Sequence, residues 1–217
     1  MEGTEGGGKT TQIELLARKL RAQGRTVRVL REPGGTPIGE EIRHTLQHSE
    51  DNRAMTPQAE LLLLNASRAQ LVREVIRPAL NAREVVLCDR FYDSTIAYQG
   101  YGRQLSLQTV STIIDFAIGD TRPDLTLLLM VPVALSETRR LTRQAIGRGK
   151  AGADSAKTKP LRDRMEEADR EFFERVETGY QAIAAAEPKR VRLLDASQSV
   201  QAVSQRIWEL VAPLLES

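Results

Sequence analysis

Apolar residues along the chain follow two kinds of spacing. Short apolar runs, typical of strands, are separated by longer segments in which apolar residues recur every three or four positions, as in amphipathic helices. The predicted strands are 26–30, 84–88, 125–131 and 191–194, and the predicted helices are 9–23, 38–47, 57–80, 105–118, 134–144, 161–186 and 200–215. This alternation predicts an α/β fold, a parallel β-sheet flanked by helices on both faces in three layers.

A glycine-rich segment precedes the first predicted helix. Residues 3–10 read G-T-E-G-G-G-K-T, which matches the pattern G-x-x-x-x-G-K-[ST] in full. The glycines let backbone N–H groups point at phosphate oxygens, Lys9 adds a cation and the Thr10 hydroxyl can bind Mg²⁺. The segment, named here the phosphate-binding loop, predicts an ATP-type triphosphate site formed by Gly3, Thr4, Glu5, Gly6, Gly7, Gly8, Lys9, Thr10 and Thr11. A solvated turn is the weaker alternative.

The strand that normally leads into such a loop is short of residues. Only Met1 and Glu2 precede Gly3, whereas a buried strand needs about five residues. The sequence therefore predicts that the first strand of the sheet is missing. We expect a trimmed or misassigned start, because a sheet without its central strand leaves backbone groups unpaired. Activity of the chain as given is a separate question.

A second cluster of polar residues, D-R-F-Y-D-S at 89–94, follows the predicted strand 84–88. Ligands of parallel sheets bind beyond the carboxyl ends of the strands. Asp89 could orient Mg²⁺ or its waters there, and Arg90 could hold a second anion with its guanidinium fork. A surface ion pair between the two is the alternative interpretation.

The segment 147–159 is small, polar and basic, with several arginines on either side. It predicts either a disordered surface loop or a lid that closes over the triphosphate, and the flanking arginines favour the lid. With this lid, at about 143–165, the length fits a single domain spanning residues 1–217.

Composition narrows the classes of partner. The 31 basic and 29 acidic residues give a net charge of +2, which does not suggest binding to nucleic acid or to a membrane surface. No apolar stretch approaches the roughly 20 residues of a transmembrane helix. The single cysteine, Cys88, lies in an apolar run, which predicts a packed thiol and suits a reducing cytoplasm.

The chain closely resembles the bacterial thymidylate kinases over almost its whole length. The matching segments include R-E-P-G-G-T-P-I-G-E-E-I-R at 31–43, A-S-R-A-Q at 66–70, D-R-F-Y-D-S-T-I-A-Y-Q-G-Y-G-R at 89–103, R-P-D-L-T at 122–126, the charged run at 163–176 and D-A-S at 195–197. The resemblance implies a cytoplasmic, homodimeric kinase that uses ATP and Mg²⁺ to convert dTMP to dTDP.

The resemblance also implies roles for individual residues. Arg43 and Arg90 would hold the dTMP phosphate, and Arg68 and Gln99 would read the thymine edge. The implied acceptor site is Glu32, Arg43, Leu64, Arg68, Arg90, Ser94, Tyr98 and Gln99. The implied catalytic residues are Lys9, Arg90, Glu5, Arg148 and Arg164, with Thr10 and Asp89 at the metal.

The sequence departs from the family at two further places, Leu64 and the lid, and it differs from one subtype of the family at Gly6. Leu64 stands where the family has a phenylalanine stacked on thymine, which would cost about 0.5–1.5 kcal/mol of aromatic contact. Gly6 stands where one subtype carries an arginine, so the positive charge should come from the lid, with Arg148 and Arg164 as candidates. The lid also has extra residues at about 150–161.

Other functions stay open at this point. Another nucleotide or deoxynucleoside kinase of the same fold would share the phosphate-binding loop, and so would a nucleotide-dependent regulatory ATPase. An assay of ATP against a panel of acceptors would separate these from a thymidylate kinase.

Overall fold

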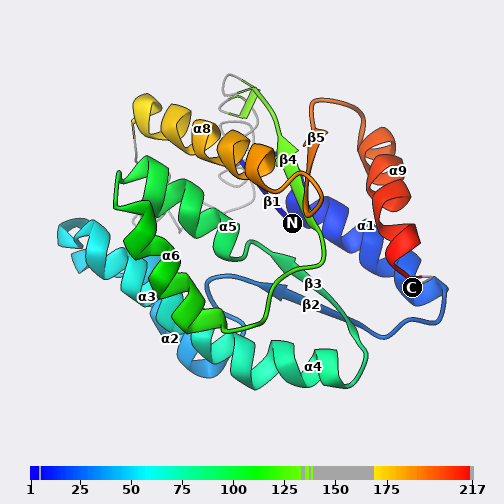
Figure 1. The fold of residues 1–217 in the computed structure, drawn as a ribbon, viewed down its shortest axis with the longest axis horizontal. Helices are drawn as coiled ribbons and strands as arrows, with labels where there is room; N and C mark the ends of the chain where they lie inside the picture. The colour runs from blue at the N-terminus through cyan, green and yellow to red at the C-terminus, as the bar shows by residue number, and fades with distance from the viewer. Residues whose placement is uncertain (5, 133–134, 137, 139–168, 216–217) are drawn as a thin grey trace, which may run out of the picture.

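The computed structural model describes residues 1–4, 6–132, 135–136, 138 and 169–215. Its strands are all parallel, and helices lie on both sides of them (Figure 1). β4 pairs with β1 and β5, and β2 pairs with β3. Within the described residues the strands are β1 (Glu2–Gly3), β2 (Val27–Arg31), β3 (Val85–Asp89), β4 (Thr126–Met130) and β5 (Val191–Asp195). The predicted fold class, a parallel sheet flanked by helices, is confirmed.

The expectation of a missing first strand needs correction. A two-residue strand, β1, stands in that position and pairs with Leu128 and Leu129 of β4. On its other side, the Met1 amino group donates to the Cys88 carbonyl at 2.6 Å and the Arg90 N–H donates to the Met1 carbonyl at 2.9 Å. Met1 to Gly3 therefore connect the β2–β3 pair to the β4–β5 pair, in the order β2-β3-β1-β4-β5.

The short β1 leaves β3 less covered than its apolar sequence predicts. Residues of β4 are buried except for Met130, whereas all five residues of β3 are only half-buried. Among the described strands, β3 pairs along its full length with β2 alone. An apolar run thus predicts a strand correctly, but its burial depends on its neighbours.

Most helices agree with the predicted spans, but the helix predicted at 161–186 begins at Arg170 after the extended residue Asp169, and 161–168 lie outside the described residues. They are α1 (Lys9–Ala22), α2 (Pro37–Gln47), α3 (Pro57–Leu71), α4 (Arg77–Asn81), α5 (Tyr92–Thr95), α6 (Leu107–Ile118), α8 (Arg170–Ala186) and α9 (Val200–Val211), with short 3₁₀ segments at Glu50–Ala54 and Ala212–Leu215. A π-helical segment at Val72–Ile76 joins α3 to α4. The three segments form one continuous helical stretch, which corresponds to the single predicted helix 57–80. The predicted helix 134–144 lies mostly, and the lid entirely, outside the described residues.

One helical stretch was not predicted from the sequence. Residues Tyr92 to Thr95 form α5, and a π-helical segment, Ile96–Gly102, continues it. Its polar residue Asp93 is buried because Arg190 donates to both carboxylate oxygens at 2.8 Å. Helix prediction relies on apolar residues at helical spacing on the buried face. Polar residues that are buried because they are paired interrupt this pattern.

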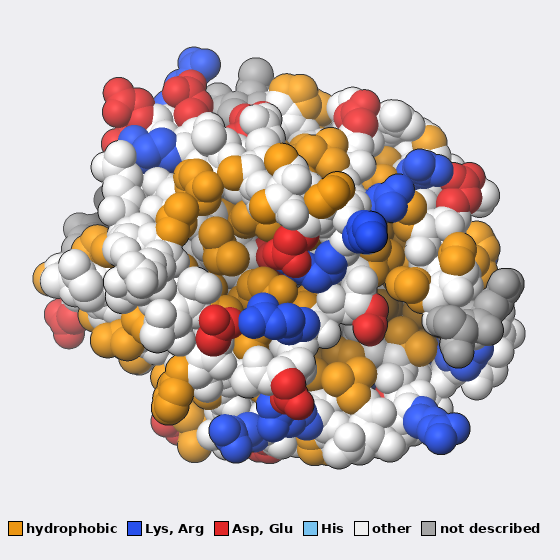
Figure 2. Space-filling view, viewed as in Figure 1, with side chains coloured by type: hydrophobic (Ala, Val, Ile, Leu, Met, Phe, Trp, Pro, Cys, Tyr) orange, Lys and Arg blue, Asp and Glu red, His pale blue; other side chains and the backbone are white. Residues whose placement is uncertain are grey.

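Hydrophobic clusters lie on both faces of the strands. Leu16 and Leu20 of α1 pack with Val203 and Ile207 of α9 against β4 and β5. Phe172, Val176 and Tyr180 of α8 cover the opposite face together with Tyr98. No helix among the described residues is long and apolar enough to cross a membrane. Basic and acidic side chains are interspersed on the face shown in Figure 2.

Candidate active site

A cavity of about 340 Å³ opens beside the carboxyl ends of β2 and β3. Its walls come from the phosphate-binding loop, from α2 and α3, and from the helical stretch after β3. Eleven of the residues predicted for the site line it: Lys9, Thr10, Glu32, Arg43, Leu64, Arg68, Asp89, Arg90, Ser94, Tyr98 and Gln99. Glu5, Arg148 and Arg164 lie outside the described residues, and Gly3, Thr4, Gly6, Gly7, Gly8 and Thr11 do not line the cavity.

The phosphate-binding loop has the backbone that its glycines predict. Gly8, immediately before α1, has a φ of 80°, a conformation that favours glycine. A Cβ at Gly3 would lie 1.9 Å from the Leu129 carbonyl oxygen, so only glycine fits against β4. The Lys9 ammonium reaches back over the loop and donates to the carbonyls of Gly3 and Thr4 at 3.1 and 3.0 Å. The loop therefore presents one cation beside the N-terminus of α1.

Oxygen ligands meet where the phosphate-binding loop approaches the end of β3. The Thr10 hydroxyl donates to Oδ2 of Asp89 at 3.2 Å, and both side chains line the cavity. Mg²⁺ prefers a few protein oxygens, with water and phosphate oxygens completing its shell. Among the described residues no three His, Cys, Asp or Glu side chains cluster as a metal site. This pair fits Mg²⁺ bound together with a nucleotide.

Arg90 sits on a backbone turn that aims its side chain into the cavity. Its φ of 66° is in the left-handed region. Its guanidinium donates to the Ser94 hydroxyl at 3.2 Å, the Tyr180 hydroxyl at 3.3 Å and the Tyr98 hydroxyl at 3.2 Å. Three hydroxyls position the guanidinium at the wall of the cavity, where its positive charge, which also interacts with the buried Glu2 carboxylate, can attract an anion.

Glu2 holds this turn from below. Its carboxylate accepts from the Phe91 N–H at 2.6 Å, the Ser94 N–H at 3.3 Å and the Tyr180 hydroxyl at 3.1 Å, and also from the Ser94 hydroxyl. Burial raises the pKa of Glu2, and burial also raises the pKa of Tyr180 well above its usual value. Sequence reasoning missed Glu2, because the two residues before Gly3 were considered too few to form a strand.

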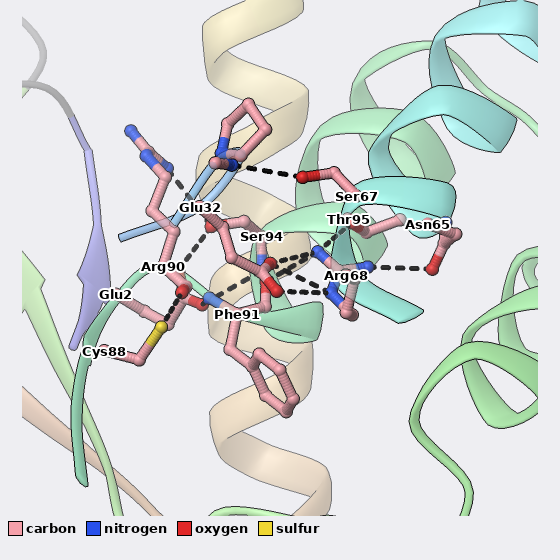
Figure 3. A network of polar contacts seen from close by, with 12 residues as sticks. Glu2, Glu32, Asn65, Ser67, Arg68, Cys88, Arg90, Phe91, Ser94 and Thr95 are labelled. Atoms are coloured by element: carbon pink, nitrogen blue, oxygen red, sulfur yellow. Dashed lines mark hydrogen bonds and ion pairs between the residues drawn. The ribbon is translucent and has the colours of Figure 1, made fainter. Parts of the chain in front are cut away.

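A buried ion pair joins α3 to the loop after β2. Arg68 is 2% exposed and donates to Glu32 from Nε at 2.9 Å and from Nη2 at 2.7 Å. The guanidinium also donates to the Asn65 side chain at 2.8 Å and to the Thr95 hydroxyl at 3.0 Å (Figure 3). Burial raises the pKa of Glu32, and the charge of Arg68 opposes this rise. Arg68 is thus held rigidly at the wall of the cavity.

A second buried carboxylate lies at the part of the cavity formed by α3 and the π-helical segment. Gln99 donates from Nε2 to Glu60 at 2.9 Å, and Arg103 donates to both oxygens of Glu60 at 3.2 Å. Glu60 and Gln99 are each 1% exposed, and half-buried Leu64 lines the same cavity. Sequence reasoning did not single out Glu60, a lone acid in the run A-E-L-L-L-L.

Comparisons with known proteins agree with this geometry. A family model described as thymidylate kinase matches residues 1–207. A thymidylate kinase from Syntrophotalea carbinolica is 45% identical over 96% of this chain and 91% of that protein. Another, from Pseudomonas savastanoi pv. phaseolicola, is 47% identical over 100% of this chain and 95% of that protein.

A solved structure gives the same assignment. The crystal structure of thymidylate kinase from Ehrlichia chaffeensis is 29% identical in sequence and matches with a TM-score of 0.73, covering 97% of this chain and 95% of that chain. The chain therefore belongs to the thymidylate kinase family.

Proposed function

We propose that this chain transfers the γ-phosphate of ATP to dTMP and releases dTDP and ADP. Membership of the thymidylate kinase family is the basis of the proposal. One structural observation carries it to this chain: a single cavity is lined by Lys9 of the phosphate-binding loop, by Arg90 and by the buried residues Arg68 and Gln99. A donor phosphate, an acceptor phosphate and a base can therefore occupy one continuous space.

The proposed chemistry needs charge neutralisation rather than a general base. A phosphate monoester has a second pKa near 6, so the dTMP phosphate is mostly a dianion at neutral pH and is already a nucleophile. Lys9 would neutralise the donor and Arg90 the acceptor, which lets two anions approach in line. Thr10 and Asp89 would hold Mg²⁺, which supplies further positive charge at the donor phosphates.

The remaining site residues complete the proposal. Arg43 donates to the Pro33 carbonyl at 2.9 Å and lines the same cavity as Arg90, to which it adds a second cation. Ser94 and Tyr98 would line the sugar site, and Glu32 would help to position the acceptor. Leu64, Arg68 and Gln99 would contact thymine. Glu5 is proposed to reach the deoxyribose 3′-hydroxyl, and Arg148 and Arg164 to add lid charge at the triphosphate.

We also propose the family's assembly for this chain. Several large hydrophobic side chains of α2, α3 and α6, which pack side by side, are exposed: Ile38, Leu62, Leu107 and Phe116. A second copy of the chain covering this surface would form a homodimer. The unit would be one kinase domain, 1–217, with its lid at about 143–165, working in the cytoplasm.

A panel of acceptors tests the function. Purified protein is incubated with ATP and Mg²⁺ and with dTMP, dUMP, dCMP, dGMP or thymidine, and nucleoside diphosphate formation is measured by chromatography. We expect dTMP to give the highest kcat/KM. A higher value for another nucleotide or for the nucleoside would indicate a different kinase, and ATP hydrolysis that no acceptor changes would indicate a regulatory ATPase.

A further inference from the structure

The orientation of the Gln99 side-chain amide is fixed by a neighbour that nothing above assigns to the reaction. The amide lies at the wall of the cavity, and its Nε2 group donates to Oε1 of Glu60 at 2.9 Å. Glu60 lies on α3 and Gln99 on the π-helical segment, so two separate elements set this contact. Both side chains are buried, so a mispaired polar atom here would be costly.

The chemistry of Glu60 allows only one orientation of the amide. An ionised carboxylate accepts hydrogen bonds and cannot donate them. Arg103 supplies the counter-charge, because its Nε and Nη2 groups donate to the two Glu60 oxygens at 3.2 Å each. A reversed Gln99 amide would place its carbonyl oxygen against the carboxylate, which is repulsive. Glu60 therefore takes the NH₂ end, and the carbonyl oxygen is the end left for a ligand.

We propose that Glu60 is a positioning residue that selects the base by orienting Gln99. The inference rests on the proposed function in one respect, that the acceptor nucleotide places its base beside Gln99. Thymine and uracil carry an N–H donor at ring position N3, whereas N3 of cytosine is an acceptor. A carbonyl oxygen fixed toward the cavity accepts a hydrogen bond from N3–H of thymine or uracil. The same oxygen repels the lone pair on N3 of cytosine.

The buried guanidinium of Arg68 supplies the complementary group. It lines the same cavity and can only donate, which suits the O4 carbonyl of thymine and not the amino group of cytosine. One fixed donor and one fixed acceptor together match a thymine edge. Glu32 orients Arg68 through its ion pair, and Glu60 orients Gln99 through its hydrogen bond. Each of the two side chains that contact the base is therefore oriented by its own buried carboxylate.

The test uses a pair of acceptors that differ only on this edge. dTMP and 5-methyl-dCMP have the same size and the same methyl group, but opposite hydrogen-bonding character at N3 and at position 4. The ratio of their kcat/KM values is measured for the wild type and for Glu60→Gln. The glutamine can offer its own NH₂ group to Gln99 and so allow the amide to reverse. We expect the ratio to fall by about tenfold, since one buried pair becomes mismatched.

Glu74→Gln is the matched control. Glu74 lies in the same helical stretch and accepts from Gln70 Nε2 at 2.7 Å, but this pair is exposed and does not line the cavity. Its substitution should leave the ratio unchanged. If Glu60→Gln lowers kcat/KM for both acceptors by the same factor, Glu60 has only a structural role and the inference is wrong. A wild type without preference for dTMP would instead contradict the proposed function.

A second variant guards against misfolding. Glu60→Gln/Gln99→Glu exchanges the carboxylate and the amide, so the NH₂ group at 60 can donate to the carboxylate at 99 and an acceptor oxygen again faces the cavity. If the single variant melts well below the wild type, the exchanged pair becomes the test. A preference for dTMP in the exchanged pair supports the inference, and its absence in a folded protein overturns it.

Discussion

At the scale of single residues, the acceptor side of the site depends on one strained position. Arg90 adopts a left-handed backbone, and its guanidinium is held by the hydroxyls of Ser94, Tyr98 and Tyr180. A non-glycine residue in this conformation persists only where its surroundings fix it. Glu2 provides that support through the Phe91 and Ser94 amides. The strained backbone, held by Glu2, therefore determines the position of the Arg90 guanidinium.

Removing the Arg90 guanidinium should reduce turnover and spare ATP binding. Arg90→Ala deletes the proposed acceptor clamp, and the loss of one such charge-stabilising group typically costs about 10²–10³ in kcat. ATP affinity, measured by calorimetry without acceptor, should stay nearly unchanged. Arg122→Ala is the control, because that arginine is half-exposed and pairs with Asp115 away from the cavity. Wild-type turnover in Arg90→Ala would rule out the clamp.

Cys88 should make stability fall at alkaline pH. Burial raises the pKa of the Cys88 thiol well above its ordinary value of 9.0, and the thiol donates to the Arg90 carbonyl at 3.0 Å. The folded protein thus keeps a proton that the unfolded chain loses as pH rises. This contribution to stability is complete below the unfolded pKa and disappears at a rate approaching about 1.4 kcal/mol per pH unit above it.

Comparison with Cys88→Ser isolates the thiol. Serine can donate to the same carbonyl and does not ionise. The free energy of unfolding, measured with urea at several values between pH 7 and pH 10, should fall more steeply in the wild type. Parallel curves for the two proteins would mean that the thiol titrates normally.

At the scale of secondary-structure elements, close packing of α8 against the π-helical segment holds the acceptor wall in place. Two glycines allow the approach: a Cβ at Gly179 would lie 2.8 Å from the Tyr101 ring, and one at Gly102 would lie 2.6 Å from Phe172. Tyr180 of the same helix reaches Glu2 and Arg90. The spacing of these two elements therefore sets the position of the Arg90 guanidinium.

Gly179→Ala should destabilise the protein through this contact. The added methyl group forces α8 and Tyr101 apart, and overpacking of this kind costs about 1–3 kcal/mol. Urea denaturation measures the change. Thr178→Ala is the control, because Thr178 is exposed on the same helix and should change stability by less than about 0.5 kcal/mol. Equal effects of the two substitutions would show that helix propensity, not packing, decides.

The same elements show how far sequence patterns reach. Helices such as 107–118 follow from apolar spacing, and the phosphate-binding loop follows from its glycines, because both signals are local. The stretch 92–102 was missed because Asp93 and Gln99 are buried by partners distant in sequence, Arg190 and Glu60. Pairing across the chain leaves no periodic signal, so the supporting residues of the site could not be predicted from the sequence.

At the scale of the whole molecule, the helices on the two faces of the strands differ in what they contribute. α1 and α9 cover one face, and the cavity opens at the ends of β2 and β3 beside the helices of the other face. The exposed surface of α2, α3 and α6 lies on elements that also supply Arg43, Leu64 and Arg68 to the cavity. A partner docking there would buttress the acceptor site from behind.

A charge on that surface should dissociate the proposed dimer. Phe116 is 88% exposed on α6, and Phe116→Asp would bury an unpaired carboxylate in the interface. Sedimentation velocity should give a dimer for the wild type and a monomer for the variant. Val200→Asp, at a half-exposed position on α9, should leave the wild-type mass unchanged. A monomeric wild type would contradict the proposed assembly.

Glu2 is followed directly by Gly3, the first residue of the phosphate-binding loop, and its carboxylate grips the turn that carries Arg90. The Glu2 carboxylate thus links the start of the phosphate-binding loop to the turn of Arg90 by hydrogen bonds to the Phe91 and Ser94 amides. A compound that distorts the phosphate-binding loop should therefore also displace Arg90. An inhibitor that occupies only the ATP site or only the dTMP site should consequently weaken binding of both nucleotides.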